Sequence, residues 1–132
     1  MIGKTKSQGW EIGVSRTLPV SIEQAWALIV DALGLPPALA APEDGVPEKG
    51  TAFEAKDQTR IEIRSYEQYS LIRMKWQPPG WDMNSTLQIR VRPAKTGTTI
   101  SVHHEWLENA AQREAMRVHW TTVLEGFREA GN

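Results

Sequence analysis

The last third of the chain constrains the fold most, because two alternating strands lead directly into an amphipathic helix. Residues 83–92 and 98–107 each alternate apolar and polar side chains, and a short turn at 93–97 separates them. This spacing predicts an antiparallel hairpin with one apolar face. The helix expected at 109–127 carries one apolar stripe. Each apolar surface can leave water only by packing on the other, which predicts an α+β fold with a curved antiparallel sheet around a long C-terminal helix.

The segments before this hairpin fit the same arrangement. Partial alternation predicts a first strand at 10–18, and helical spacing of apolar residues predicts a short N-terminal helix at 21–33. Ser21 and Gln24 have the spacing of a capping box, and Gly34 suits the C-terminal cap. The proline-rich segment 34–50 predicts a loop with a short helical turn near 37–41. The rest of the chain is predicted to form an antiparallel meander, with strands at 51–56, 60–66 and 69–76.

Bulk properties narrow the classes of function. A length of 132 residues predicts one domain spanning 1–132, and a net charge of −1 argues against a nucleic-acid-binding surface. The absence of cysteine excludes disulfides and thiol chemistry and fits a cytoplasmic location. The first ten residues lack the apolar run of a signal peptide, and no segment is long and apolar enough to span a membrane. No metal-ligand spacing, nucleophile motif or phosphate loop is present, so no metal, cofactor or catalytic residue is predicted.

Apolar and aromatic side chains on the expected inner surfaces are the candidate ligand-binding residues. The sequence holds six tryptophans, whose flat rings either fill a core or line a cavity for an apolar ligand. A concave sheet face and the stripe of the final helix should enclose that cavity. The residues expected to line it or to form the core around it are Trp26, Met74, Trp76, Ile89, His104, Trp106, Met116, Trp120 and Val123.

The three histidines are the candidate polar groups. His103 and His104 are adjacent in a strand, so they point to opposite faces and cannot readily chelate one ion. His104 should share the inner face with Val102 and Trp106, where desolvation favours the neutral form. Three roles stay open for His104: a core histidine with satisfied hydrogen bonds, a partner for a ligand carbonyl or hydroxyl, or an acid–base group. His119, on the final helix, is expected at a rim or on the surface.

Several motifs together resemble a known family. Arg16-Thr17-Leu18-Pro19 running into the first helix is similar to the opening of activators of the 90-kDa heat-shock-protein ATPase, a branch of the START-like (SRPBCC) superfamily. The strand Leu71–Trp76, the run from Gly97 to His104 and the pair Trp120 and Leu124 resemble later signatures of that family. The order of these motifs covers nearly the whole chain. His119 departs from the pattern, since the family usually has glycine there.

The resemblance implies a helix-grip fold and a cavity that binds an apolar or lipid-like small molecule. It also leaves two alternatives open, a cyclase- or hydrolase-type enzyme that uses the same cavity, and a module that interacts with a chaperone in a stress response. Apart from His104, the strand residues expected to face the cavity are apolar, so His104 has no acid–base partner there. Binding without catalysis is therefore favoured over the enzyme. The sequence leaves open whether the protein is a monomer or a homodimer.

Overall fold

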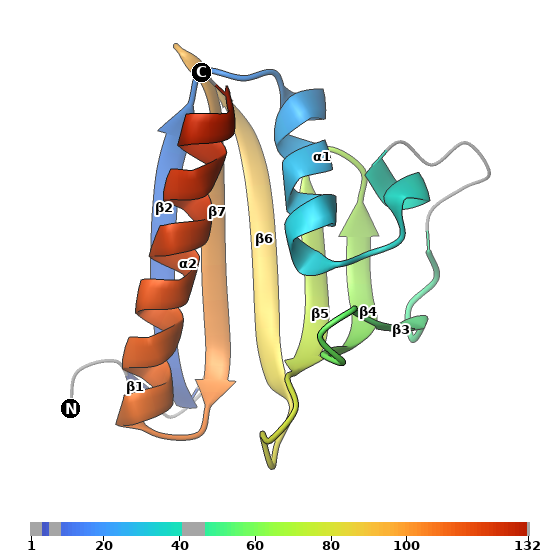
Figure 1. The fold of residues 1–132 in the computed structure, drawn as a ribbon, viewed down its shortest axis with the longest axis vertical. Helices are drawn as coiled ribbons and strands as arrows, with labels where there is room; N and C mark the ends of the chain where they lie inside the picture. The colour runs from blue at the N-terminus through green and yellow to red at the C-terminus, as the bar shows by residue number, and fades with distance from the viewer. Residues whose placement is uncertain (1–3, 6–8, 41–46, 132) are drawn as a thin grey trace.

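A computed structural model describes residues 4–5, 9–40 and 47–131 of the chain. The described strands form one antiparallel sheet in the order β1-β2-β7-β6-β5-β4-β3, and two helices lie side by side over one face of it (Figure 1). The strands are β1 (Lys4–Thr5), β2 (Gly9–Leu18), β3 (Ala52–Glu54), β4 (Arg60–Glu67), β5 (Leu71–Gln77), β6 (Ser85–Ala94) and β7 (Gly97–Leu107). The helices are α1 (Ile22–Leu33) and α2 (Ala110–Gly131), with a short 3₁₀ turn, η1 (Pro37–Ala40), after α1. The predicted α+β fold is confirmed.

The first helix begins and ends where the sequence predicts. The Ser21 hydroxyl accepts the Gln24 backbone N–H at 3.1 Å, and the Gln24 side chain accepts the Ser21 N–H at 2.9 Å, so both halves of the capping box form. Gly34 ends the helix with a left-handed φ of 71°. The short helical turn expected near 37–41 is present as η1. Part of the predicted loop, residues 41–46, lies outside the described residues.

The hairpin between β6 and β7 is tighter than predicted. Ala94 pairs with Gly97, so the turn consists of two residues and Pro93 still lies in the strand. Gly97 has a φ of +150°, and a Cβ atom there would lie 1.9 Å from the Leu18 carbonyl oxygen. The start of β7 therefore approaches the end of β2 so closely that only glycine fits.

The last helix packs against β2 and β7, and α1 packs beside it against β6 and β7. The Asn109 side chain accepts the Gln112 backbone N–H at 2.8 Å and caps α2, as the sequence predicts. The Gln112 side chain accepts the N–H of Glu108 instead of that of Asn109. Cap formation therefore fixes the position at which the chain leaves β7.

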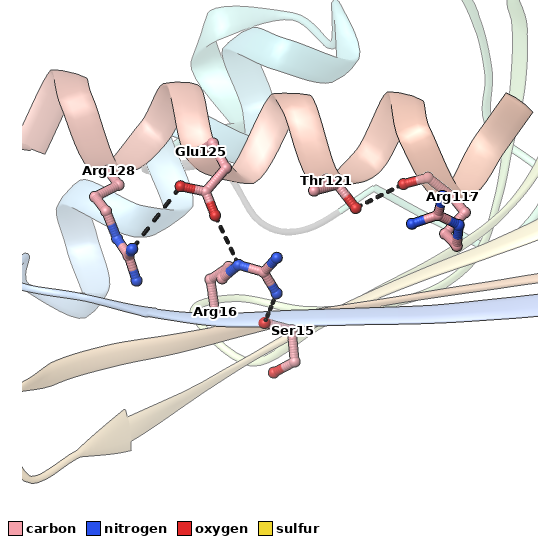
Figure 2. A network of polar contacts seen from close by, with 6 residues as sticks. All are labelled: Ser15, Arg16, Arg117, Thr121, Glu125 and Arg128. Atoms are coloured by element: carbon pink, nitrogen blue, oxygen red, sulfur yellow. Dashed lines mark hydrogen bonds and ion pairs between the residues drawn. The ribbon is translucent and has the colours of Figure 1, made fainter.

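Two arginines, Arg16 and Arg113, tie α2 to β2. Arg16 Nε donates to Glu125 Oε1 at 2.8 Å, and Arg128 lies 3.8 Å from the other oxygen of the same carboxylate (Figure 2). Nearer the start of α2, Arg113 Nε donates to the Glu11 carbonyl oxygen at 2.8 Å. These contacts are partly exposed and contribute little energy each, but they set the position of the helix along the strand.

The core fills the layer between the sheet and the two helices. The inner face of the sheet contributes alternating residues that are almost fully buried, and each helix contributes an apolar stripe. Ile63, Met74, Leu87 and Ile100 are fully buried on the sheet side. Trp26, Ile29, Trp120 and Leu124 are among the buried residues that the helices contribute.

The alternation of β7 breaks at one position, which corrects the expected placement of Trp106. The pairing of β2 with β7 shifts between Trp10 and Ile12, so Glu105 and Trp106 together lie opposite Glu11. Trp106 takes a left-handed φ of 58°, and its side chain is 44% exposed. Because of this bulge, Trp106 does not share the inner face with His104.

Candidate functional site

An open groove of about 930 Å³ lies at one end of the helix layer. Its walls are the C-terminal half of α1 with the turn after it, β3 with the turn that leads to β4, the end of β5, and the first half of α2. Figure 1 shows how these walls are arranged: α1 ends partway along the sheet, and the lower part of β5 extends beyond it. The volume lies in the range of small-molecule sites.

Three tryptophans form the aromatic floor of this groove: Trp76 on β5, Trp81 in the turn after β5, and Trp120 on α2. The Trp76 ring centroid lies 5.6 Å from that of Trp81 and 5.5 Å from that of Trp120. The Gln77 side chain donates to the Trp81 carbonyl oxygen at 2.7 Å and so holds the turn in place. Met116 and Phe53 add apolar surface on the two sides.

The wall near η1 is held by a buried hydrogen-bond network around Trp26. Trp26 Nε1 donates to the Leu39 carbonyl oxygen and to the Tyr66 hydroxyl oxygen, both at 3.2 Å. The Tyr66 hydroxyl in turn donates to the Leu39 carbonyl oxygen at 2.8 Å. Trp26 therefore fixes η1 to α1 and β4, and η1 places Ala40 in the groove wall.

Charged and polar side chains surround the aromatic floor. The described polar residues that line the groove are Asp31, Glu54, Lys56, Asp57, Thr59 and His119. His119 is solvent-accessible at the rim, as predicted. Partial burial of its imidazole against the groove lowers the pKa of His119, and the nearby Asp57 carboxylate acts in the opposite direction. Hydrogen bonding from Thr59 is the main cause that holds the pKa of Asp57 below its usual range.

His104 lies beneath the aromatic floor and makes its hydrogen bonds inside the protein. Trp120 Nε1 donates to His104 Nδ1 at 3.0 Å, so the proton of the neutral ring is on Nε2. His104 Nε2 lies 2.7 Å from the Ser85 hydroxyl, and that hydroxyl donates to the Trp76 carbonyl oxygen at 2.6 Å. Both ring nitrogens are occupied and the residue is fully buried. Of the three roles left open, this geometry fits the satisfied core histidine.

The structure separates the predicted site residues into four groups. Three of them, Trp76, Met116 and Trp120, line the groove. Ile89 and Val123 border a second hollow between the two helices and β6 and β7, whose volume of about 10 Å³ leaves room for about one water. Trp26, Met74 and His104 are fully buried core residues. Trp106 is exposed at the bulge of β7 and lines neither hollow.

Sequence reasoning missed most of the groove wall. Trp26 was the one candidate on α1, but Asp31 and Gly34 at the C-terminal end of that helix line the groove instead. Asp57 and Thr59 lie in the turn between β3 and β4, where periodicity carries no information. Trp81 follows the Pro78-Pro79-Gly80 break, and its aromatic ring was the one signal that could have identified it.

Two negative findings concern the described part of the chain. Among residues 4–5, 9–40 and 47–131, no group of three or more histidine or acidic side chains is arranged to hold a metal ion. Neither α1 nor α2, the two described α-helices, is long and apolar enough to cross a membrane.

Solved structures with the same fold come from several bacteria. The protein MLL2253 from Mesorhizobium loti is 18% identical, with a TM-score of 0.65 over 90% of this chain and 94% of that one. BH1534 from Bacillus halodurans is 17% identical, with a TM-score of 0.68 over 92% and 96%. CalU16 from Micromonospora echinospora is 15% identical, with a TM-score of 0.69 over 89% and 71%. At these identities the likeness concerns the fold alone.

A comparison of the sequence with protein-family models identifies the family of this chain. Among curated proteins, none matches this sequence. The family model described as "Activator of Hsp90 ATPase homolog 1-like protein" matches residues 19–131, from the proline before α1 to the end of α2. Since this match covers β3 to β7, both helices and every residue that lines the groove, the chain belongs to the family of activator of Hsp90 ATPase homolog 1-like proteins.

Proposed function

We propose that this protein binds an apolar or lipid-like small molecule in the groove between the end of α1, the β3–β4 turn and the first half of α2. The observation that carries the proposal is the groove of about 930 Å³ whose floor is made of Trp76, Trp81 and Trp120. Flat aromatic rings at the bottom of an open groove provide contact area for an apolar ligand with little loss of side-chain entropy. We place this activity in the cytoplasm, which fits the absence of cysteine.

Binding without catalysis is the form of this function that the side chains support. An acid–base role for His104 would require a ring nitrogen that reaches the ligand, but Trp120 and Ser85 occupy both nitrogens. The groove lies at one end of the sheet–helix layer and not at its centre. There, Ile89, Val123 and their neighbours leave a volume of only about 10 Å³.

The test uses the neutral fluorescent probe N-phenyl-1-naphthylamine and two matched tryptophan deletions. We expect Trp81→Ala to weaken probe binding by roughly fivefold or more, since it removes one ring of the floor. Trp106→Ala removes the same kind of side chain at an exposed position that does not line the groove, and it should leave the affinity unchanged. Circular dichroism checks that both variants are folded. Absence of probe binding to the wild-type protein, or a loss with Trp106→Ala alone, would contradict the proposal.

A further inference from the structure

Three tryptophans of the described structure are more than nine-tenths buried, and they differ in what their indole N–H groups bind. Trp26 Nε1 donates to a backbone carbonyl oxygen and to a tyrosine hydroxyl, and Trp120 Nε1 donates to His104 Nδ1. Trp76, the third, is 7% exposed, and its Nε1 makes no hydrogen bond with any described residue. Because a buried indole N–H usually has a partner, this unused donor requires an explanation.

The rings packed around Trp76 cannot accept its N–H. The ring centroids of Trp81 and Trp120 lie 5.6 and 5.5 Å from that of Trp76, and an indole nitrogen donates but does not accept. The His104 centroid lies 5.1 Å away, but the acceptor nitrogen of that ring, Nδ1, already takes the Trp120 N–H. The His119 ring is farther away, at 6.5 Å, and makes no hydrogen bond with Trp76. The donor is therefore left for a partner from outside the chain.

The Trp76 donor can be reached from the groove. Trp76 lies near the end of β5 and lines the groove. In the described structure, the side-chain polar atoms that are sealed from solvent and lack a partner are Glu11 Oε2 and Thr59 Oγ1. Trp76 Nε1 is not one of them, so it keeps contact with solvent, and the groove is the hollow that this side chain lines. A single donor in an aromatic floor is the kind of polar group that orients an apolar ligand.

From this arrangement we infer that the ligand of the groove is a neutral apolar molecule with a carbonyl oxygen, which accepts the Trp76 indole N–H while the hydrocarbon part lies on the tryptophan floor. This inference rests on the proposed binding function. A ketone or ester oxygen accepts a hydrogen bond and brings no donor of its own, so no ligand group is left unpaired on the floor. A carboxylate would exchange its hydration for one neutral donor, which is unfavourable.

The indole N–H signals of the ¹⁵N-labelled protein test this donor directly. Without ligand, we expect the Trp76 N–H to exchange with solvent roughly tenfold or more faster than those of Trp26 and Trp120, which are buried and hydrogen-bonded. The compounds 2-acetylnaphthalene and 2-ethylnaphthalene have nearly the same shape, but only the first has a carbonyl oxygen. The acetyl compound should shift the Trp76 N–H proton downfield and slow its exchange, and the ethyl compound should do neither.

Affinities measured by displacement of N-phenyl-1-naphthylamine locate the effect at one residue. Trp76→Phe keeps an aromatic ring but removes the N–H, so it should weaken binding of the acetyl compound about three- to tenfold more than binding of the ethyl compound. Trp120→Phe is the matched control on the floor, because the Trp120 N–H is already bound to His104. That variant should weaken both compounds by the same factor. The anion 2-naphthoate should bind the wild-type protein more weakly than the acetyl compound does.

The outcomes separate the inference from the function on which it rests. If the naphthalenes bind and Trp81→Ala weakens them, but the acetyl compound leaves the Trp76 N–H signal unshifted, the binding function stands and the carbonyl inference is wrong. The inference is also wrong if the Trp76 N–H of the free protein is as protected as that of Trp26, or if 2-naphthoate binds best. If Trp76→Phe does not fold, the wild-type spectra decide. If neither the naphthalenes nor N-phenyl-1-naphthylamine binds, the proposed function itself fails.

Discussion

At the scale of single residues, His104 is a titratable group with a structural role. Its two ring nitrogens join Trp120 of α2 to Ser85 of β6, and Ser85 continues to the Trp76 carbonyl oxygen of β5. Burial is the main cause that lowers the pKa of His104 to about 3, and the charges of His119 and His103 lower it further. The residue thus connects the helix to two strands only while it is neutral.

His104 should make the protein less stable as the pH falls. Its folded-state pKa of about 3 lies below the unfolded value of 6.5, so between these values the unfolded chain binds more protons and stability is lost on acidification. Urea unfolding at pH 7 and pH 5 should show a loss of about 2 kcal/mol from this residue. His104→Gln keeps one acceptor and one donor but does not titrate, so it should remove that part of the pH dependence. An equal loss in wild type and His104→Gln would show that other groups are responsible.

At the scale of elements, the β6–β7 hairpin is positioned by the contact of its second strand with β2. Gly97 lies directly after the two-residue turn, where the Leu18 carbonyl oxygen leaves no space for a side chain. The same strand ends in the bulge at Trp106 and then leads into α2 through the Asn109 cap. The close approach at one end and the bulge at the other therefore fix where α2 begins.

Two glycine substitutions test this arrangement. Gly97→Ala should lower the free energy of unfolding by at least ~2 kcal/mol, because the methyl group would force β7 away from β2. Gly126→Ala is the matched control, since a Cβ atom at Gly126 in α2 meets nothing within 4 Å. That variant should be more stable than wild type by about 0.5–1 kcal/mol through helix propensity. Chemical denaturation of both variants measures the difference, and a tolerated Gly97→Ala would refute the close-approach argument.

At the scale of the whole molecule, one continuous core joins the sheet to both helices. Trp120, Leu124 and Phe127 of α2 belong to the same cluster as Trp26 and Ile29 of α1. In the described structure both helices bury their apolar residues in this one cluster. We therefore expect residues 1–132 to unfold as one cooperative domain.

Truncation of α2 tests this expectation. A chain that ends at Glu108 loses every α2 residue of the core and should show no cooperative thermal transition by circular dichroism. A chain that ends at Arg128 keeps Trp120, Leu124 and Phe127 and should still melt sharply. A sharp transition in the shorter chain would mean that the sheet and α1 are stable without α2.

Much of the fold could be predicted because local patterns specify it. The capping box at Ser21, the glycine cap at Gly34 and the Asn109 cap each depend on residues that are neighbours in sequence, and all three form. The alternation in β5 and β6 also predicted which side chains are buried, as for Met74 and Ile89. Trp106 was misplaced because a bulge reverses alternation and depends on the pairing with β2, which local periodicity does not contain.

The candidate site was predictable only in part, for the same reason. Trp76, Met116 and Trp120 were expected at the inner surface because each lies on a periodic apolar face. Asp31, Asp57 and Trp81 come from a helix end and two turns that are brought together only when the chain is folded. The sequence alone determines the class of fold, both helix starts, the end of α1 and most of the buried faces, since these follow from local hydrogen bonding and from the period of apolar residues. Only the tertiary structure decides that His104 is satisfied internally and that the open space lies beyond the end of α1, because both depend on contacts between segments far apart in the chain.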